Sequence, residues 1–370
     1  MNALVFAFAG ICLIAVHLLR APAGGRRVGA VLAFILGLAI TATGVRFAVS
    51  EAGIGRTTDF DRVVNHAVAE ADAANSPLIV FTGASYSRNA IDPERFTKYL
   101  RAHGYPHTAI NLSLEAASLP EREAHLEDFI TRLERPPELV FAEVAEAFDA
   151  RPAQFFNNSK FSARGIEQFG PRTSAWTLLG LAEGGCSGMA DCIKSAGLTG
   201  AHFGLNALNI GSVARGEAPS ETGELAAYDP QTQPREETAA KDRLNGLRSG
   251  PDYVPTVGLK WISSLRAMFE NRLERKGVAT IGYYFPPVID GGARAYVDGL
   301  CLAELVHTTC ISPSDPELLA ALEGEVWLDQ SHLLASGANI YSDWLADQII
   351  VSGALGAPAG SDFAEDASAP

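Results

Sequence analysis

Two long apolar runs open the chain and constrain its organisation more than any other feature. Met1–Leu19 and Val28–Val45 contain no charged residue, and the short linker between them carries three arginines. Each run is long enough to cross a hydrocarbon core of about 30 Å as a helix. By the positive-inside rule the basic linker faces the cytoplasm. We therefore expect residues 1–50 to form a transmembrane helical hairpin that places everything after Arg46 outside the cytoplasm.

Two other interpretations of these runs stay open. A cleaved signal peptide requires basic residues ahead of its apolar stretch, whereas the first basic residue here is Arg20. A buried hairpin in a soluble domain would also accommodate apolar helices. The anchor is the prediction, and it implies a cytoplasmic-membrane protein whose main domain is periplasmic or extracytoplasmic.

The rest of the chain is acidic. The whole sequence has 29 basic and 43 acidic residues, and no acidic residue precedes Glu51, so the excess of negative charge falls on the main domain. Such a domain repels phosphate backbones, which argues against nucleic acid as a partner.

Four cysteines form two closely spaced pairs. Cys186 precedes Cys192 by six positions and Cys301 precedes Cys310 by nine, so each pair could close a short disulfide loop. The alternative is four unrelated thiols. Neither pair has the C-x-x-C spacing of a structural zinc site, and no other cluster has metal-ligand spacing, so no metal or other cofactor is expected.

Strands and helices alternate along much of the chain. Short apolar runs predict strands, and apolar positions at helical spacing predict helices between them. The expected strands are 76–83, 108–113, 139–144 and 278–285, and the expected helices are 60–73, 93–103, 120–133, 257–276 and one within 332–350. This order is typical of an α/β domain with a parallel sheet covered on both faces.

The alternation stops between about 150 and 255. This stretch includes a polar segment, Arg215–Arg243, and is expected to be an insertion that is partly an ordered cap and partly a mobile loop. The main domain then spans 51–351. The small and polar residues of 352–370 predict a disordered tail.

Ser85 lies directly after the first strand of the domain. In open parallel sheets, ligands bind beyond the carboxyl ends of the strands, so the Ser85 hydroxyl is a candidate nucleophile. The alternative is a serine that only forms a turn or caps a helix. A serine nucleophile needs a base and a carboxylate that orients the base. Asp329 and His332, just ahead of the closing helix, could supply both, although a solvated histidine beside a capping aspartate fits the same letters.

Three segments together resemble the SGNH (GDSL-like) hydrolase superfamily. They are 81–93 around Ser85, 110–119, and Asp329-Gln-Ser-His332 followed by Gly337. The resemblance implies a flavodoxin-like sheet with Ser85 as nucleophile, His332 as base and Asp329 as the residue that orients it. It also implies an oxyanion hole that includes the backbone N–H groups of Ser85 and Ala116.

The chain departs from the family pattern at three places. Ala84 stands where the family has aspartate, and Ala116 where it has the glycine of the oxyanion hole. After the third strand, Glu143-Val-Ala-Glu146 replaces a segment that supplies an asparagine. An ionised carboxylate cannot donate a hydrogen bond to an oxyanion, so one donor is unassigned. One of these two glutamates is expected to line the pocket and the other to be solvated.

Two functions remain open. The first is a membrane-anchored serine esterase or O-acyltransferase that acts on a cell-envelope glycan through an acyl-enzyme. The family resemblance includes membrane-anchored partners of membrane-bound O-acyltransferases, so such a protein is a candidate partner. The second is a non-catalytic binding or assembly protein of an envelope polysaccharide system on the same fold. The remaining histidines considered, His66, His103, His107 and His125, are expected to be solvated.

Overall fold

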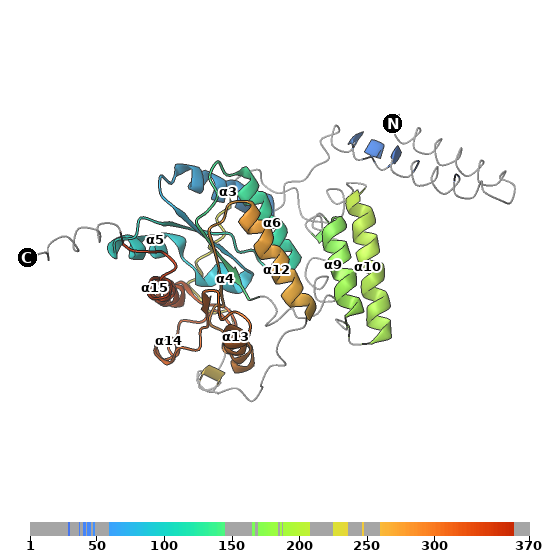
Figure 1. The fold of residues 1–370 in the computed structure, drawn as a ribbon. Helices are drawn as coiled ribbons and strands as arrows, with labels where there is room; N and C mark the ends of the chain where they lie inside the picture. The colour runs from blue at the N-terminus through green and yellow to red at the C-terminus, as the bar shows by residue number, and fades with distance from the viewer. Residues whose placement is uncertain are drawn as a thin grey trace, which may run out of the picture.

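A computed structural model describes residues 59–144, 165–166, 169–183, 186, 188–207, 225–235, 246–247 and 260–358, together with nine helical positions scattered between 29 and 48. Within these residues the chain forms an α/β domain around a parallel sheet (Figure 1). The predicted fold class is confirmed at this level.

The sheet of the described part has five strands, all parallel, in the order β2-β1-β3-β4-β5. The strands are β1 (Leu78–Thr82), β2 (Thr108–Asn111), β3 (Leu139–Glu143), β4 (Thr280–Tyr284) and β5 (Cys310–Ile311). This is the order of flavodoxin-like doubly wound sheets, in which ligands bind where the chain switches direction, beyond the carboxyl ends of β1 and β3.

Helices cover both faces of the sheet. One core contains the β1 residue Val80 and packs under α3 (Asp59–Ala73), α6 (Leu119–Arg132), α12 (Lys260–Arg275) and α13 (Gly291–Ala303). The other core contains Phe81, the next residue of β1, and packs under α5 (Pro93–Ala102), α14 (Pro316–Ala321) and α15 (Ala335–Val351). Because successive strand side chains point to opposite faces, β1 contributes to both cores and is fully buried.

The predicted insertion contains a pair of helices. The helices α9 (Pro171–Ala182) and α10 (Met189–Ala207) pack on each other, and Figure 1 shows them beside α12, on the side of the domain away from α5. A small core of Phe169, Ile262 and Leu265 joins the pair to α12. The insertion is therefore attached to the α6–α12 face of the domain.

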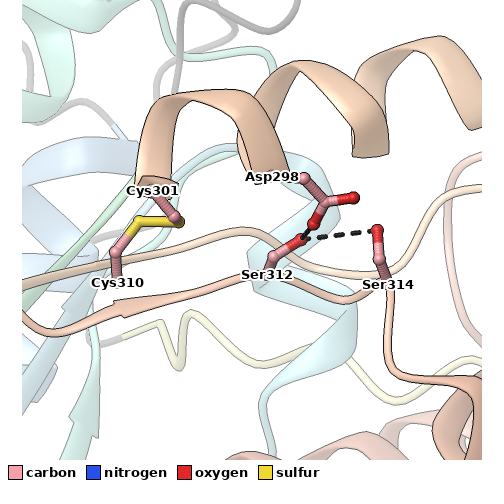
Figure 2. Close-up of a disulfide and its surroundings, with 5 residues drawn as sticks. All are labelled: Asp298, Cys301, Cys310, Ser312 and Ser314. Carbon is pink, nitrogen blue, oxygen red and sulfur yellow. Dashed lines mark hydrogen bonds between the residues drawn. A yellow bond between two sulfur atoms is a disulfide. The ribbon is translucent and has the colours of Figure 1, made fainter. Parts of the chain in front are cut away.

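Both predicted disulfides are present. Cys186–Cys192 precedes and enters α10, and Cys301–Cys310 joins the end of α13 to β5, the edge strand. Figure 2 shows Asp298 and Ser312 beside the second disulfide, where the Ser312 hydroxyl donates to the Asp298 carboxylate. A hydrogen bond and a covalent bond thus connect the same two segments.

The two ends of the chain are described only in part. No helix among the described residues is long and apolar enough to span a membrane. The predicted span 1–19 lies outside those residues, and 28–45 is described only at scattered positions. At the other end, the predicted tail is described as far as Pro358, and Leu355 is buried in the second core, while 359–370 lie outside the described residues.

Candidate active site

Ser85 begins a short helix at the carboxyl end of β1. The strand ends at Thr82, and α4 (Ser85–Ala90) starts three residues later with Ala84 as its N-cap, so Ser85 is not itself the capping residue. Buried Asn111, at the end of β2, holds this helix in place. Its amide donates to the carbonyl of Ile91 at 2.9 Å. The nucleophile candidate therefore sits on backbone anchored to the neighbouring strand.

Asp329 and His332 lie on a compact loop between α14 and α15. The Leu328 N–H donates to the carbonyl of His332 at 2.9 Å and closes the loop. Buried Trp327 anchors it, because its indole N–H donates to the Leu322 carbonyl at 2.8 Å. A Cβ on Gly337 would lie 2.6 Å from the carbonyl oxygen of Val326, so a glycine is needed where α15 approaches the loop.

The structure brings Ser85, His332 and Asp329 together in one hydrogen-bonded chain. The Ser85 Oγ lies 2.8 Å from Nε2 of His332. The other ring nitrogen, Nδ1, lies 2.8 Å and 2.9 Å from the two carboxylate oxygens of Asp329. The side chains of His332 and Asp329 are about one-fifth exposed, at 19% and 20%, so the site is open to a substrate. This is the order of contacts in a nucleophile–base–carboxylate triad.

The environment of Asp329 keeps its carboxyl group ionised. Burial alone would raise its pKa, but hydrogen bonds from the His332 ring and from the backbone N–H groups of Ser331 and His332 outweigh burial and lower it. A carboxylate with its charge retained fixes Nδ1 as the proton-bearing nitrogen of a neutral His332. Nε2 is then free to accept a proton from Ser85.

Tyr86 adds a contact that the sequence did not indicate. Its ring stacks on the His332 ring with 5.0 Å between centroids and 24° between planes. An imidazolium over the face of an aromatic ring is stabilised by the ring quadrupole. Tyr86 thus places an aromatic face against the imidazole ring of His332.

The loop after β2 carries the predicted oxyanion residue. Ala116 has φ of +53°, and it is the non-glycine residue with positive φ in the described part of the chain. This left-handed conformation costs an L-residue about 1 kcal/mol or more and is usual for glycine. Ala116 thus adopts a backbone conformation that is usual for glycine.

Glu143 lies at the site but faces the interior. Its carboxylate accepts a hydrogen bond from the Ala84 N–H at 2.9 Å and pairs with Arg122 at 3.0 Å. It fills no donor role toward an oxyanion. Glu146 and Asn157 lie outside the described residues.

A segment of the insertion, residues 225–235, contacts both parts of the site. Residues 225–235 contact α4 through Arg88, whose Nε donates to the Ala227 carbonyl at 2.8 Å. The same segment contacts the acid–base loop, since the Arg235 N–H donates to the Leu328 carbonyl at 2.8 Å. This part of the expected mobile loop, which contains neither helix nor strand, therefore links the Ser85 helix to the Asp329–His332 loop.

Two histidines that were expected to be solvated are buried. His107 and His125 are 4% and 5% exposed. His125 packs on Phe60 and contacts its carbonyl oxygen at 2.9 Å, and burial lowers its pKa to about 4. Both expectations were wrong because these two histidines point toward neighbouring elements of the fold. The amino-acid sequence alone does not reveal that orientation.

Comparisons with protein-family models, with curated proteins and with solved structures find no match to this chain.

Proposed function

We propose that this chain is a membrane-anchored serine esterase or O-acyltransferase of the SGNH type that acts on a cell-envelope glycan outside the cytoplasm. The hydrogen-bonded chain from Ser85 through His332 to Asp329 carries the proposal. It lies at the carboxyl ends of the central strands, where doubly wound sheets bind ligands. The flavodoxin-like strand order and the glycine-like conformation of Ala116 support the same assignment.

The mechanism follows from the roles of the three side chains. The Ser85 oxygen attacks the ester carbonyl carbon while Nε2 of His332 takes the hydroxyl proton. When the carbon–oxygen bond to the leaving group breaks, His332 returns that proton to the departing oxygen and an acyl-serine remains. Water then regenerates the enzyme by hydrolysis, or a glycan hydroxyl does so by transfer, with His332 again accepting the proton.

The anchor and the location rest on other features. The two disulfides fit an oxidising compartment. The charge-free runs and their basic linker give the orientation. A cysteine at Gly24 should resist an impermeant thiol reagent on intact cells, whereas one at Gly223 should react. The opposite labelling pattern would contradict this topology.

A non-catalytic binding protein is the second candidate, and one observation favours it. The segment Glu143-Val-Ala-Glu146 stands where the family pattern supplies an asparagine, and the carboxylate of Glu143 is held inward by Arg122. Losing one oxyanion donor costs a serine hydrolase about 3 kcal/mol of barrier. The test below separates the two candidates.

The deciding experiment uses the full-length protein, a fluorophosphonate probe and p-nitrophenyl acetate, beside acyl transfer to envelope oligosaccharides. Wild type should be labelled on Ser85 and should release nitrophenol in a burst. Ser85→Ala and His332→Ala should abolish turnover with the fold intact, and the double variant should be little slower than either single one. No labelling and no reaction in wild type would favour the binding protein.

A further inference from the structure

The buried carboxylate of Glu143 holds the turn that carries Ser85. Its side chain is fully buried at the end of β3, and one oxygen accepts hydrogen bonds from the Ala84 N–H at 2.9 Å and from the Ser87 hydroxyl. These two residues flank Ser85 on either side. A Cβ on Gly83 would lie 2.5 Å from the same carboxylate oxygen, so the turn is packed directly on Glu143.

Arg122, which pairs with Glu143, contacts the loop that contains Ala116. Arg122, in the first turns of α6, places its NH1 nitrogen 3.0 Å from the second carboxylate oxygen of Glu143. Its Nε donates to the carbonyl of Ala117 at 3.0 Å. Ala117 follows Ala116, the residue with the glycine-like backbone. One ion pair thus connects the nucleophile turn to the oxyanion loop.

A buried charge pair needs both members. Arg122 is 5% exposed and Glu143 4%, and either charge left alone in the interior would cost several kcal/mol. The pair is therefore expected to stay assembled throughout the reaction. Its outer contacts then fix the Ser85 turn and the Ala116 loop with respect to each other.

We propose that Arg122 and Glu143 are positioning residues that set the spacing between the Ser85 hydroxyl and the oxyanion-binding N–H of Ala116. The inference rests on the proposed acyl-transfer function. Neither side chain contacts the reacting atoms. An oxyanion donor works only within about 2.7 to 3.1 Å of the developing charge, and a misplacement of about 1 Å can cost about 100-fold in rate. The pair acts by holding that distance.

The test compares Arg122→Lys with a matched control, Arg272→Lys. Arg272 is also a buried arginine, 7% exposed, and pairs with Glu123 and Glu127 between α12 and α6. These two ion pairs reach neither the nucleophile turn nor the oxyanion loop. Lysine keeps the charge in both variants but lacks the planar group that lets one arginine bind two partners in fixed directions.

Arg122→Lys should lower kcat at least about tenfold with KM changed less than about twofold, because the lost spacing affects the transition state more than substrate binding. The affinity for an alkylboronic acid, which forms a tetrahedral adduct on serine, should fall by the same factor as kcat/KM. Arg272→Lys should change neither quantity. Thermal unfolding of both variants measures the purely structural cost.

Glu143→Gln provides a second route to the same result. Its amide oxygen can still accept from Ala84, but the charge that holds Arg122 is lost, so kcat should again fall and KM should hold. If Arg122→Lys and Glu143→Gln turn over as fast as Arg272→Lys, or if neither folds, the positioning role is wrong. If wild type itself neither reacts nor is labelled, the proposed function fails instead.

Discussion

The ring of Tyr86 stacks on the ring of His332, with 5.0 Å between their centroids. Tyr86 follows the candidate nucleophile Ser85 in sequence. In the proposed mechanism, the same short helix then supplies the hydroxyl that loses a proton and the ring that supports the imidazole that gains it. A charged imidazole over an aromatic face is stabilised by about 0.5 to 1 kcal/mol at an exposed site.

Tyr86→Ala should therefore lower kcat about two- to fivefold, because the imidazolium forms only as the reaction proceeds. Tyr86→Phe keeps the ring and should remain close to wild type. Steady-state hydrolysis of p-nitrophenyl acetate measures both. Equal losses in the two variants would mean that the hydroxyl, and not the ring, matters.

Asp329→Asn should reduce turnover strongly, by up to about 10⁴-fold if the serine-protease precedent applies, because an amide can hold His332 in the wrong tautomer. The pKa of Asp329 is lowered, so its carboxylate stays ionised below its ordinary titration range. Because Asp329 does not titrate between pH 7 and pH 5, the ratio of the wild-type rate to the variant rate should stay constant over that range. A ratio that collapses toward one at pH 5 would show that Asp329 titrates there.

Removal of the Cys301–Cys310 disulfide should lower the free energy of unfolding by about 2.5 kcal/mol in the chain-entropy model for a loop this short. The bond joins α13 to the edge strand and lies in neither triad segment, so probe labelling of Ser85 in the folded Cys301→Ser/Cys310→Ser variant should persist. Urea unfolding and labelling at the same temperature check the two parts separately. Loss of labelling in a folded variant would tie this edge to the site.

Acid should destabilise the protein through His125. Burial lowers its pKa from 6.5 to about 4, so the unfolded chain binds a proton that the folded chain rejects between those values. Stability from this group is present at pH 7 and is lost as the pH falls, by about 3 kcal/mol in all. Glu123 has the opposite sign, since burial raises its pKa to about 7.

His125→Gln isolates the histidine from that opposing contribution. The glutamine variant keeps Glu123, so urea unfolding at pH 7 and pH 4 should show a smaller loss on acidification than wild type. Identical losses in the two proteins would remove His125 as the cause.

The central strands and the triad could be predicted from sequence because each leaves a local pattern. Leu78–Thr82 is a continuous apolar run before a small-residue turn, and Asp329 and His332 lie three positions apart ahead of a helix. The edge strand Cys310–Ile311 is only two residues long, which is too short to show the alternation of apolar and polar residues that marks a strand. The helix α10 is rich in glycine and alanine and weakly amphipathic, so its letters did not mark it as a helix.

The Arg122–Glu143 pair could not be predicted for another reason. The sequence around Arg122 and around Glu143 does not indicate that the two residues pair. Their contact forms only when α6 packs against the end of β3. Tyr86 and His332 likewise meet only through the fold. A side-chain role that depends on contact between two separate helices, strands or loops can be recognised only once the fold is known.

Ser85 and His332 are 247 positions apart in sequence, which has a consequence for biosynthesis. A chain is made from its N-terminus, so the hydroxyl emerges long before its proton acceptor, and the first three strands can pair while the acid–base loop does not yet exist. A chain that ends before the acid–base loop therefore has Ser85 without the His332 ring beside it. The hydrogen-bonded chain from Ser85 to Asp329 can therefore form only in molecules whose synthesis has passed His332.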